Sequence, residues 1–204
     1  YTGLSCLSSK ANMAVETKKL QFRQRSTGEA LKEFELNLKQ HEFIQSAKRY
    51  ILFSGGFGAG KTLSLIIKAI KLSIQYPNNN GLIGRLHYQD LRDTVYKDFL
   101  SVCPEQYIED IIKSERKVIL FNGSELIFRH LDKISEKEIR SLNLGFFAID
   151  QVEDVSEPVY LALKGRLRRQ DTSQQGFMTA NPANTWIYRE FKQTTKESNH
   201  LIEI

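Results

Sequence analysis

The pattern of apolar and polar residues changes at about residue 39. Beyond it, short apolar runs alternate with longer segments in which apolar residues recur at helical spacing. The segment after Lys61, TLSLIIKAIKLSIQY, is apolar on nearly every side and predicts a buried helix that ends at the PNNN sequence of residues 77–80. Asn122-Gly123, between two short apolar runs, predicts a hairpin turn. We expect strands at 50–54, 81–85, 118–121, 125–129, 145–150, 175–180 and 200–204, and helices at 61–76, 91–100 and 158–168.

This alternation predicts an α/β fold with a mainly parallel sheet and helices on both faces. In such doubly wound sheets, ligands bind at the carboxyl ends of the strands. Residues 39–204 are expected to form this one domain, which suits a chain of 204 residues. Residues 1–38 are polar, charge-rich and only weakly periodic, so we expect a mobile or loosely docked N-terminal segment with a short helix around residues 29–38.

Composition narrows the class of protein. Hydrophobic residues make up 41% of the chain and charged residues 26%, which favours a packed core over disorder. The net charge of +5 is compatible with a nucleic-acid partner but is too small to establish one. Cys6 and Cys103 have no metal-ligand spacing and are interpreted as free thiols. No apolar run reaches the roughly 18–20 residues that span a bilayer, so we expect no membrane association.

Residues 55–62, GGFGAGKT, match the phosphate-binding pattern G-x-x-x-x-G-K-[ST] at every fixed position. A short apolar strand precedes the pattern and a strong helix follows it, which favours a P-loop over a chance glycine-rich turn. Lys61 can reach the β- and γ-phosphates of a nucleotide, and the Thr62 hydroxyl can bind Mg²⁺. The predicted nucleotide-binding residues are Gly55, Gly56, Phe57, Gly58, Ala59, Gly60, Lys61 and Thr62.

A P-loop enzyme needs a second acidic group for Mg²⁺, usually at the end of another buried strand. Asp150 ends the apolar run FFAI and fits this role, although an Asp here could also cap a following helix. Hydrolysis further needs a group that deprotonates or orients the attacking water. We assign this role to Glu153, with Asp154 as the neighbouring carboxylate. Gln151 is the alternative, since a glutamine orients the water in some GTPases.

The motifs and their order along the chain resemble the ATPase domain of bacteriophage large terminase subunits, the motors that package DNA into empty capsids. The resemblance covers about residues 38–204 and implies a P-loop NTPase fold of the ASCE/RecA-like type. It rests on the P-loop, on a glutamine upstream of it, on an arginine before Asp150, and on four further segments. These segments are GLIGRLHYQDLRDT at 81–94, IDQVED at 149–154, LKGRLR at 163–168 and TANP at 179–182.

The resemblance also implies roles for single residues. Gln40 is similar to the glutamine that reads adenine, with Gln45 as its competitor and a surface helix position as the plainer interpretation. Asn181 lies in a segment similar to the coupling motif that senses the γ-phosphate, although a simple strand-to-turn junction would explain the Asn-Pro pair. Arg85 is interpreted as a further group that faces the nucleotide.

Arg140 is similar to the arginine that terminases insert into the active site of a neighbouring subunit. Such a guanidinium offsets the charge that builds up on the transferred phosphoryl group. Arg166, Arg168 and Arg169 are rivals for this role. They could instead contact DNA phosphates or form the exposed basic end of a helix.

The function implied by the resemblance is ATP hydrolysis, with Mg²⁺, to move double-stranded DNA into a procapsid. The implied partners are further copies of the chain in a ring on the capsid portal and the small terminase subunit. The implied location is the bacterial host cytoplasm, transiently docked on the procapsid and outside the finished virion. Large terminases normally continue into a nuclease domain, and because the sequence stops at Ile204 we expect no nuclease activity from it.

Two other functions share the same motifs. A helicase or repair ATPase would have the same P-loop and Asp150, but it would be expected to continue into a second motor-like domain. A regulatory module would bind ATP with little turnover. Gln151 favours this last alternative, because many related ATPases have a glutamate directly after the strand-end aspartate.

Overall fold

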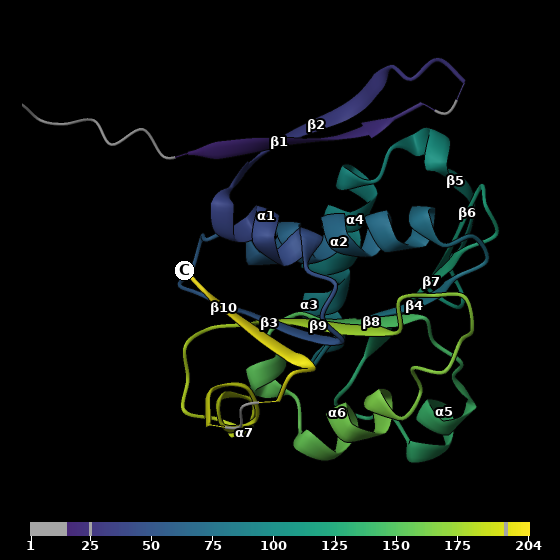
Figure 1. Cartoon of the computed structure of the whole chain (residues 1–204). Helices are drawn as coiled ribbons and strands as arrows, with labels where there is room; N and C mark the ends of the chain where they lie inside the picture. Colours follow the sequence, from purple (N-terminus) through teal and green to yellow (C-terminus); the bar gives the residue numbers. More distant parts are fainter. Residues whose placement is uncertain (1–15, 25, 194–195) are drawn as a thin grey trace, which may run out of the picture.

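The computed structural model describes residues 16–24, 26–193 and 196–204, so Cys6 and the rest of residues 1–15 lie outside the described residues. Eight strands of the described chain form one twisted sheet (Figure 1). In chain order they are β3 (Tyr50–Ser54), β4 (Asn80–Arg85), β5 (Ile108–Ile112), β6 (Lys117–Leu120), β7 (Glu125–His130), β8 (Phe146–Ile149), β9 (Gln175–Ala180) and β10 (Asn199–Glu203). Their order across the sheet is β10-β3-β9-β8-β4-β7-β6-β5.

The strands from β10 to β7 run parallel, whereas β6 and β5 are antiparallel to their neighbours. Helices cover both faces of the sheet (Figure 1). One face carries α1 (Leu38–Gln45), α2 (Lys61–Gln75) and α4 (Lys97–Val102), and the other carries α5 (Glu136–Ser141), α6 (Glu157–Lys164) and α7 (Trp186–Tyr188). A short α3 (Tyr88–Asp90) continues into a π-helical turn, Leu91–Tyr96. The predicted α/β architecture is therefore confirmed.

Side chains along each central strand alternate between two apolar cores, as the two-residue period of a strand requires. In β8, Phe146 and Ala148 enter the core beneath α1 and α2, whereas Phe147 and Ile149 enter the core beneath α6. All four side chains are fully buried, so the strand reads as a continuous apolar run. The same alternation decides which polar residues at the strand ends face α2.

The register of the parallel strands brings their carboxyl ends together. Ile149 of β8 pairs with Met178 of β9, and Phe53 of β3 pairs with Thr179. On the other side of β8, Ile149 pairs with Gly84 of β4. The loop after β3 and the residues that end β4, β8 and β9 therefore meet at one edge of the sheet, where such folds bind ligands.

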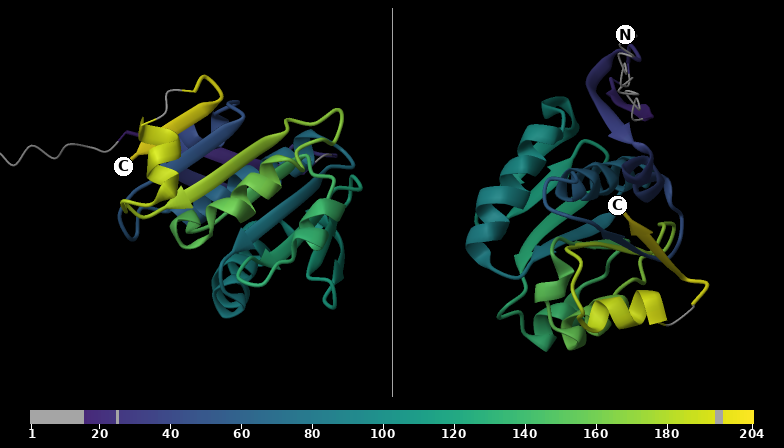
Figure 2. Two further views of the ribbon diagram at one scale, coloured as in Figure 1. Left: turned by 90° about the horizontal axis from the view of Figure 1, so that it is seen from below. Right: turned by 90° about the vertical axis from the view of Figure 1, so that its left-hand side faces the viewer.

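The N-terminal segment forms a hairpin of β1 (Thr17–Arg23) and β2 (Ala30–Asn37), so the prediction of a helix around residues 29–38 was wrong. Phe34 and Leu36 alternate with glutamates, and this two-residue period gives the strand one apolar face. Phe22 and Leu36 are buried in the core on the α1 side. The hairpin lies beyond the α1–α2 layer as seen from the sheet (Figures 1 and 2).

The structure also differs from the prediction in one helix boundary and in elements that were not predicted. The expected helix 158–168 ends at Lys164, because the chain beyond it pairs with residues before β8: Leu167 forms a bridge with Leu144, and the Arg168 N–H donates to the Leu144 carbonyl at 3.2 Å. Strand β5 and helix α5 were not predicted. In the described part of the chain, no helix is long and apolar enough to cross a membrane.

Candidate functional site: a phosphate-binding loop with two carboxylates

The loop between β3 and α2 has the backbone that a phosphate-binding loop needs. Gly58 and Gly60 adopt positive φ angles of 75° and 71°, which residues with a side chain rarely adopt. Gly60 is the residue from which α2 begins, so the positive end of the helix dipole faces the loop. The Gly55 N–H donates to the Ala180 carbonyl at 3.2 Å and fixes the loop to the end of β9.

Lys61 connects this loop to the end of β9. Its Nζ lies 2.7 Å from the carbonyl oxygens of both Gly55 and Gly56 and 3.1 Å from Asn181 Oδ1. Burial lowers the pKa of Lys61, and the negative charges of Glu153 and Asp150 act in the opposite direction. The ammonium group therefore lies over the loop, within reach of both sides of the site.

Asp150 occupies the centre of the site and is only 1% exposed. Its Oδ1 accepts hydrogen bonds from the hydroxyl groups of Thr62, at 2.9 Å, and Thr179, at 2.7 Å. Its Oδ2 lies 3.3 Å from Arg85 Nη1. The alternation along the strands explains this meeting, because Asp150, Thr179 and Arg85 continue the positions of β8, β9 and β4 that face α2.

These oxygens fit a magnesium ion. Mg²⁺ is usually held by one or two carboxylates together with phosphate oxygens and water. Thr62 and Asp150 supply a hydroxyl and a carboxylate side by side, and the buried Asp150 Oδ2 accepts no hydrogen bond. Among the described residues, no group of three or more His, Cys, Asp or Glu side chains could hold a metal by itself. A hydroxyl and a carboxylate are protein ligands that suit Mg²⁺ when phosphate oxygens and water complete its shell.

Gln151 follows Asp150 in a left-handed backbone conformation, with φ of 55°. Its N–H donates to the Thr179 hydroxyl at 3.2 Å, and its side-chain oxygen accepts a hydrogen bond from Arg85 Nη2. Arg85 Nη1 also donates to the Thr94 hydroxyl at 2.7 Å. Sequence reasoning missed the contacts of Thr94 and Thr179 with this site, because they depend on the register between strands and on the path of the chain after β4.

Glu153 is held by Asn181 at the end of β9. Its Oε1 accepts hydrogen bonds from the Asn181 backbone N–H at 2.9 Å and from the side-chain Nδ2 at 2.8 Å. Burial raises the pKa of Glu153, and the hydrogen bonds from Asn181 act against this rise. Glu153 Oε2 is buried and accepts no hydrogen bond. Asp154 is exposed, so of the two carboxylates it is Glu153 that contacts the residue bound by Lys61.

Gln40 lies beside the loop at the start of α1. Its Nε2 donates to the Ala59 carbonyl at 3.1 Å, and its Oε1 accepts from the Asn37 N–H at 2.9 Å. Gln45 is at the other end of α1, where its side chain accepts a hydrogen bond from Lys71. Phe57 at the tip of the loop is 90% exposed. The structure thus places Gln40, and not Gln45, against the phosphate-binding loop.

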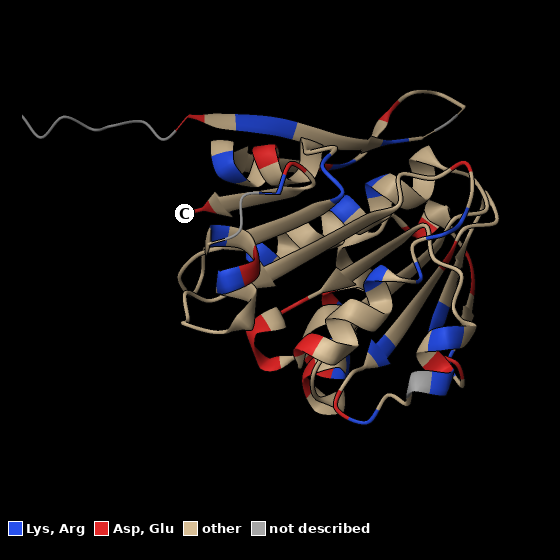
Figure 3. Ribbon diagram, turned by 60° about the horizontal axis from the view of Figure 1, so that its bottom comes forward, with Lys and Arg blue, Asp and Glu red and all other residues tan. Residues whose placement is uncertain are grey.

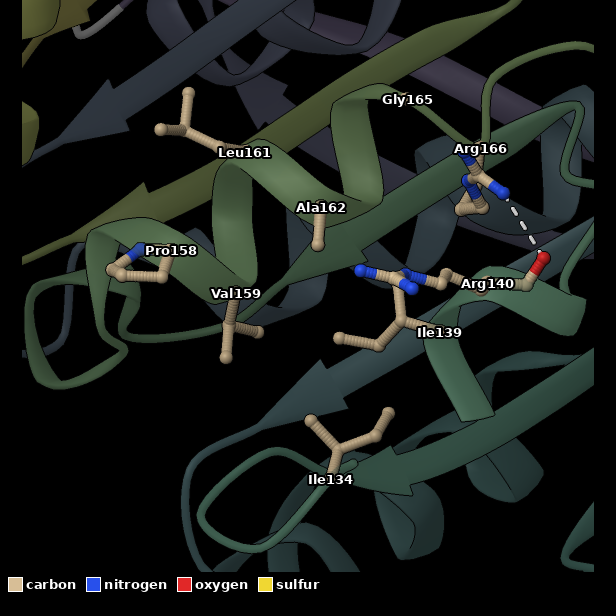
Figure 4. Close-up of a pocket in the computed structure, with 9 residues that line it drawn as sticks. All are labelled: Ile134, Ile139, Arg140, Pro158, Val159, Leu161, Ala162, Gly165 and Arg166. Carbon is tan, nitrogen blue, oxygen red and sulfur yellow. Dashed lines mark hydrogen bonds between the residues drawn. The ribbon is translucent and has the colours of Figure 1, made fainter. Parts of the chain in front are cut away.

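Arg140 lies on α5 and lines a hollow of about 350 Å³ between α5 and α6 (Figure 4). Arg166 lines the same hollow, and its Nη1 donates to the Arg140 carbonyl at 3.0 Å. Arg168 Nη2 donates to the Leu142 carbonyl at 3.2 Å. In the view of Figure 3, many of the elements that carry Lys and Arg residues also carry Asp and Glu residues.

Residues 47–203 match the family described as phage terminase large subunit. No curated protein sequence matches the chain. The large terminase of a thermophilic bacteriophage is structurally similar, with a TM-score of 0.70 and 17% identity over 82% of this chain and 44% of that chain.

Two further solved structures share the fold. The same thermophilic bacteriophage's large terminase in complex with ADP matches with a TM-score of 0.69 and 18% identity, over 82% of this chain and 44% of that chain. The large terminase ATPase domain of Thermus phage P74-26 matches with a TM-score of 0.68 and 13% identity, over 83% of this chain and 81% of that chain. The chain spans less than half the length of the thermophilic bacteriophage's large terminase but most of the P74-26 ATPase domain. These likenesses show that the chain shares the fold of large terminase ATPase domains.

Proposed function

Because this chain belongs to the phage terminase large subunit family, we propose that it is an ATPase domain that drives double-stranded DNA into a procapsid. One observation carries the proposal. Lys61 of the phosphate-binding loop contacts Asn181, which in turn holds Glu153, while the adjacent Thr62 contacts Asp150. A lysine for phosphate, oxygens for Mg²⁺ and a carboxylate for water thus lie in one connected cluster. The structures of the thermophilic bacteriophage's large terminase with ADP and with ATP-γ-S support ATP as the ligand.

The chemistry follows from the positions of these groups. The backbone N–H groups at the start of α2 and the Lys61 ammonium bind the negatively charged β- and γ-phosphates. Thr62 and Asp150 would hold Mg²⁺, which would neutralise charge on the phosphate oxygens. Glu153 accepts the proton of the attacking water as a general base. Asn181 contacts both Lys61 and Glu153, so loss of the γ-phosphate changes contacts at the end of β9.

Two further groups complete the proposed nucleotide site. Gln40 reads the adenine edge, since a side-chain amide can both donate and accept a hydrogen bond. Its position against Ala59 supports this role. Arg140 acts on the γ-phosphate of a neighbouring subunit, and its place on α5 at a surface hollow supports action between chains.

The proposed setting is a ring of these subunits on the capsid portal, together with the small terminase subunit. The protein acts in the bacterial host cytoplasm, docks transiently on the procapsid and is absent from the finished virion.

A second candidate function is a regulatory module that binds ATP with little turnover. Gln151 favours it, because the residue after Asp150 has no carboxylate and its side chain is engaged by Arg85.

Phosphate release by the wild-type chain and by Lys61→Ala, with and without double-stranded DNA, tests the proposal. Removing the ammonium should abolish release, because the phosphates lose their main positive partner. Lys192→Ala is the matched control, since Lys192 is an exposed lysine that pairs with Glu203. Release that persists in Lys61→Ala would place the reaction elsewhere. ATP binding without DNA-stimulated release would favour the regulatory module.

A further inference from the structure

We propose that Arg85 is a positioning residue of the Mg²⁺ site, which it serves by fixing the orientation of Asp150 and Gln151 from the side opposite the phosphate-binding loop. The proposal rests on the ATPase function proposed above. It assigns a role to Arg85, a mostly buried cation that the binding of the nucleotide phosphates does not require. It also connects the site to the segment that follows β4, the π-helical turn Leu91–Tyr96.

Arg85 joins three partners with one side chain. Nη1 lies 3.3 Å from Asp150 Oδ2 and donates to the Thr94 hydroxyl at 2.7 Å, and Nη2 donates to the Gln151 side-chain oxygen. The side chains of Arg85 and Asp150 are 13% and 2% exposed. A buried guanidinium and a buried carboxylate are stable only when they are paired. The ion pair between Arg85 and Asp150 therefore helps to stabilise the site.

The two carboxylate oxygens of Asp150 have different partners. Oδ1 is bound by the hydroxyl groups of Thr62 and Thr179, and Oδ2 faces Arg85. Two hydrogen bonds to Oδ1 and the ion pair of Oδ2 with Arg85 oppose rotation of the carboxylate, and this favours an Oδ1 that stays beside the Thr62 hydroxyl. Loss of a group that holds a metal ligand in this way typically costs about 10–100-fold in metal affinity or activity.

The fork of the guanidinium suits this task better than an ammonium. Its five N–H donors point in fixed directions, so one side chain can bind a carboxylate, an amide and a hydroxyl at once. Thr94, in the π-helical turn, accepts a hydrogen bond from the Arg85 guanidinium, and its own hydroxyl donates to the Asp90 carbonyl. π-helical turns are rare and often occur at functional sites. Arg85 thus ties both residues at the end of β8 to the segment after β4.

The test compares the affinity of ATP-γ-S in the presence of EDTA and in the presence of Mg²⁺, measured by calorimetry. In Arg85→Gln, affinity in EDTA should stay within about twofold of wild type, because the phosphates still bind Lys61 and the loop. The gain in affinity on adding Mg²⁺ should fall by about tenfold or more. Arg85→Lys should recover part of that gain, because it keeps the charge but loses the fork.

Thr94→Val should reduce the Mg²⁺-dependent gain in the same direction, and it decides the question if Arg85→Gln does not fold. Arg92→Gln is the matched control, since Arg92 is an exposed arginine on the same turn that pairs with Asp93 at 2.6 Å. The proposal is overturned if the gain is unchanged or larger in the folded Arg85 or Thr94 variants, or if affinity falls equally in EDTA and Mg²⁺. Lys61→Ala separates the two proposals, because it should lose affinity in both conditions.

Discussion

Asn181 and Glu153 are joined by two hydrogen bonds to a single carboxylate oxygen, one from the Asn181 backbone N–H at 2.9 Å and one from its side-chain amide at 2.8 Å. Burial raises the pKa of Glu153, and these bonds to the ionised form limit the rise. A base must be ionised to accept a proton, so turnover should be lost as the pH falls through this raised pKa. If Glu153 is the base, we expect this contact to set the lower end of the active pH range.

The first prediction concerns this acid limb. Asn181→Ala removes the side-chain bond but keeps the backbone bond, so the pKa of Glu153 should rise further. The acid limb of kcat should then move to higher pH. A pH–rate profile of each protein, normalised to its own maximum, measures the shift, with the exposed Asn184→Ala as control. A limb that stays in place or moves to lower pH contradicts the assignment of Glu153.

The second prediction separates the carboxylates after β8. Glu153→Gln should lower kcat by about 10²–10⁴-fold, the usual contribution of a general base, whereas Asp154→Asn should change it by less than about threefold.

The stability of Glu153→Gln should not fall with its kcat. A raised carboxyl pKa gives a contribution to stability that is present below the unfolded pKa and lost as the pH rises through the folded pKa. Glu153→Gln should therefore be at least as stable as wild type at neutral pH, as thermal unfolding can measure.

If the losses in kcat are reversed, Asp154 is the base. Equal, small losses in both variants would favour Gln151 as the group that orients the water. The Gln151 side chain is bound by Arg85, which would hold it in place for that role. Gln151→Ala completes the set, and it should affect kcat less than Glu153→Gln.

The third prediction tests the backbone of the phosphate-binding loop. A Cβ at Gly60 would lie 2.2 Å from Gln40 Nε2, and the φ of 71° is strained for any other residue. Gly60→Ala should lower the free energy of unfolding by about 1–3 kcal/mol and weaken ATP binding. Gly56 has no positive φ, and a Cβ there would meet nothing within 4 Å, so Gly56→Ala should change stability by less than about 0.5 kcal/mol. Urea unfolding of the pair measures the difference, and equal costs would refute this account.

The fourth prediction concerns Arg140. If it acts on the nucleotide of a neighbouring subunit, Arg140→Ala alone should lower phosphate release by about 10³–10⁵-fold. Mixing Arg140→Ala subunits with Glu153→Gln subunits should restore part of the activity, because some interfaces then combine an intact base with an intact arginine. Arg166→Ala is the comparison, since Arg166 lines the same hollow. A mixture no more active than its parts contradicts action between subunits.

The sequence predicts those features of the fold that depend on local pattern. The strand, the glycine-rich loop and the helix around Lys61 are contiguous, so their chemistry could be derived before the structure. Asp150 could be found in the same way, because a carboxylate directly after a fully apolar strand is conspicuous. The hairpin of residues 17–37 was missed because its apolar positions are few and separated by glutamates and lysines. Its signal was the two-residue alternation on either side of Gly28.

The contacts between distant segments could not be predicted in this way. Thr179 meets Asp150 because β9 lies between β3 and β8. The order of strands in a sheet cannot be predicted from the local pattern of residues. Arg85 meets Asp150 because Gly84 pairs with Ile149, so the residues that follow them lie side by side. The contact of Glu153 with Asn181 and the exposure of Asp154 likewise depend on how the turn after β8 packs. The sequence supplies the candidates, and the register of the sheet selects among them.

The central claim is that Lys61, Thr62, Asp150 and Glu153 form one ATP-hydrolysing site, and a crystal structure with Mg²⁺ and ATP-γ-S tests it most directly. The account predicts the γ-phosphate against Lys61 Nζ, the ion touching the Thr62 hydroxyl, and a water in line with the phosphorus that hydrogen-bonds to Glu153. A nucleotide bound away from the loop, or an attacking water held by Asp154 with Glu153 turned away, would contradict it.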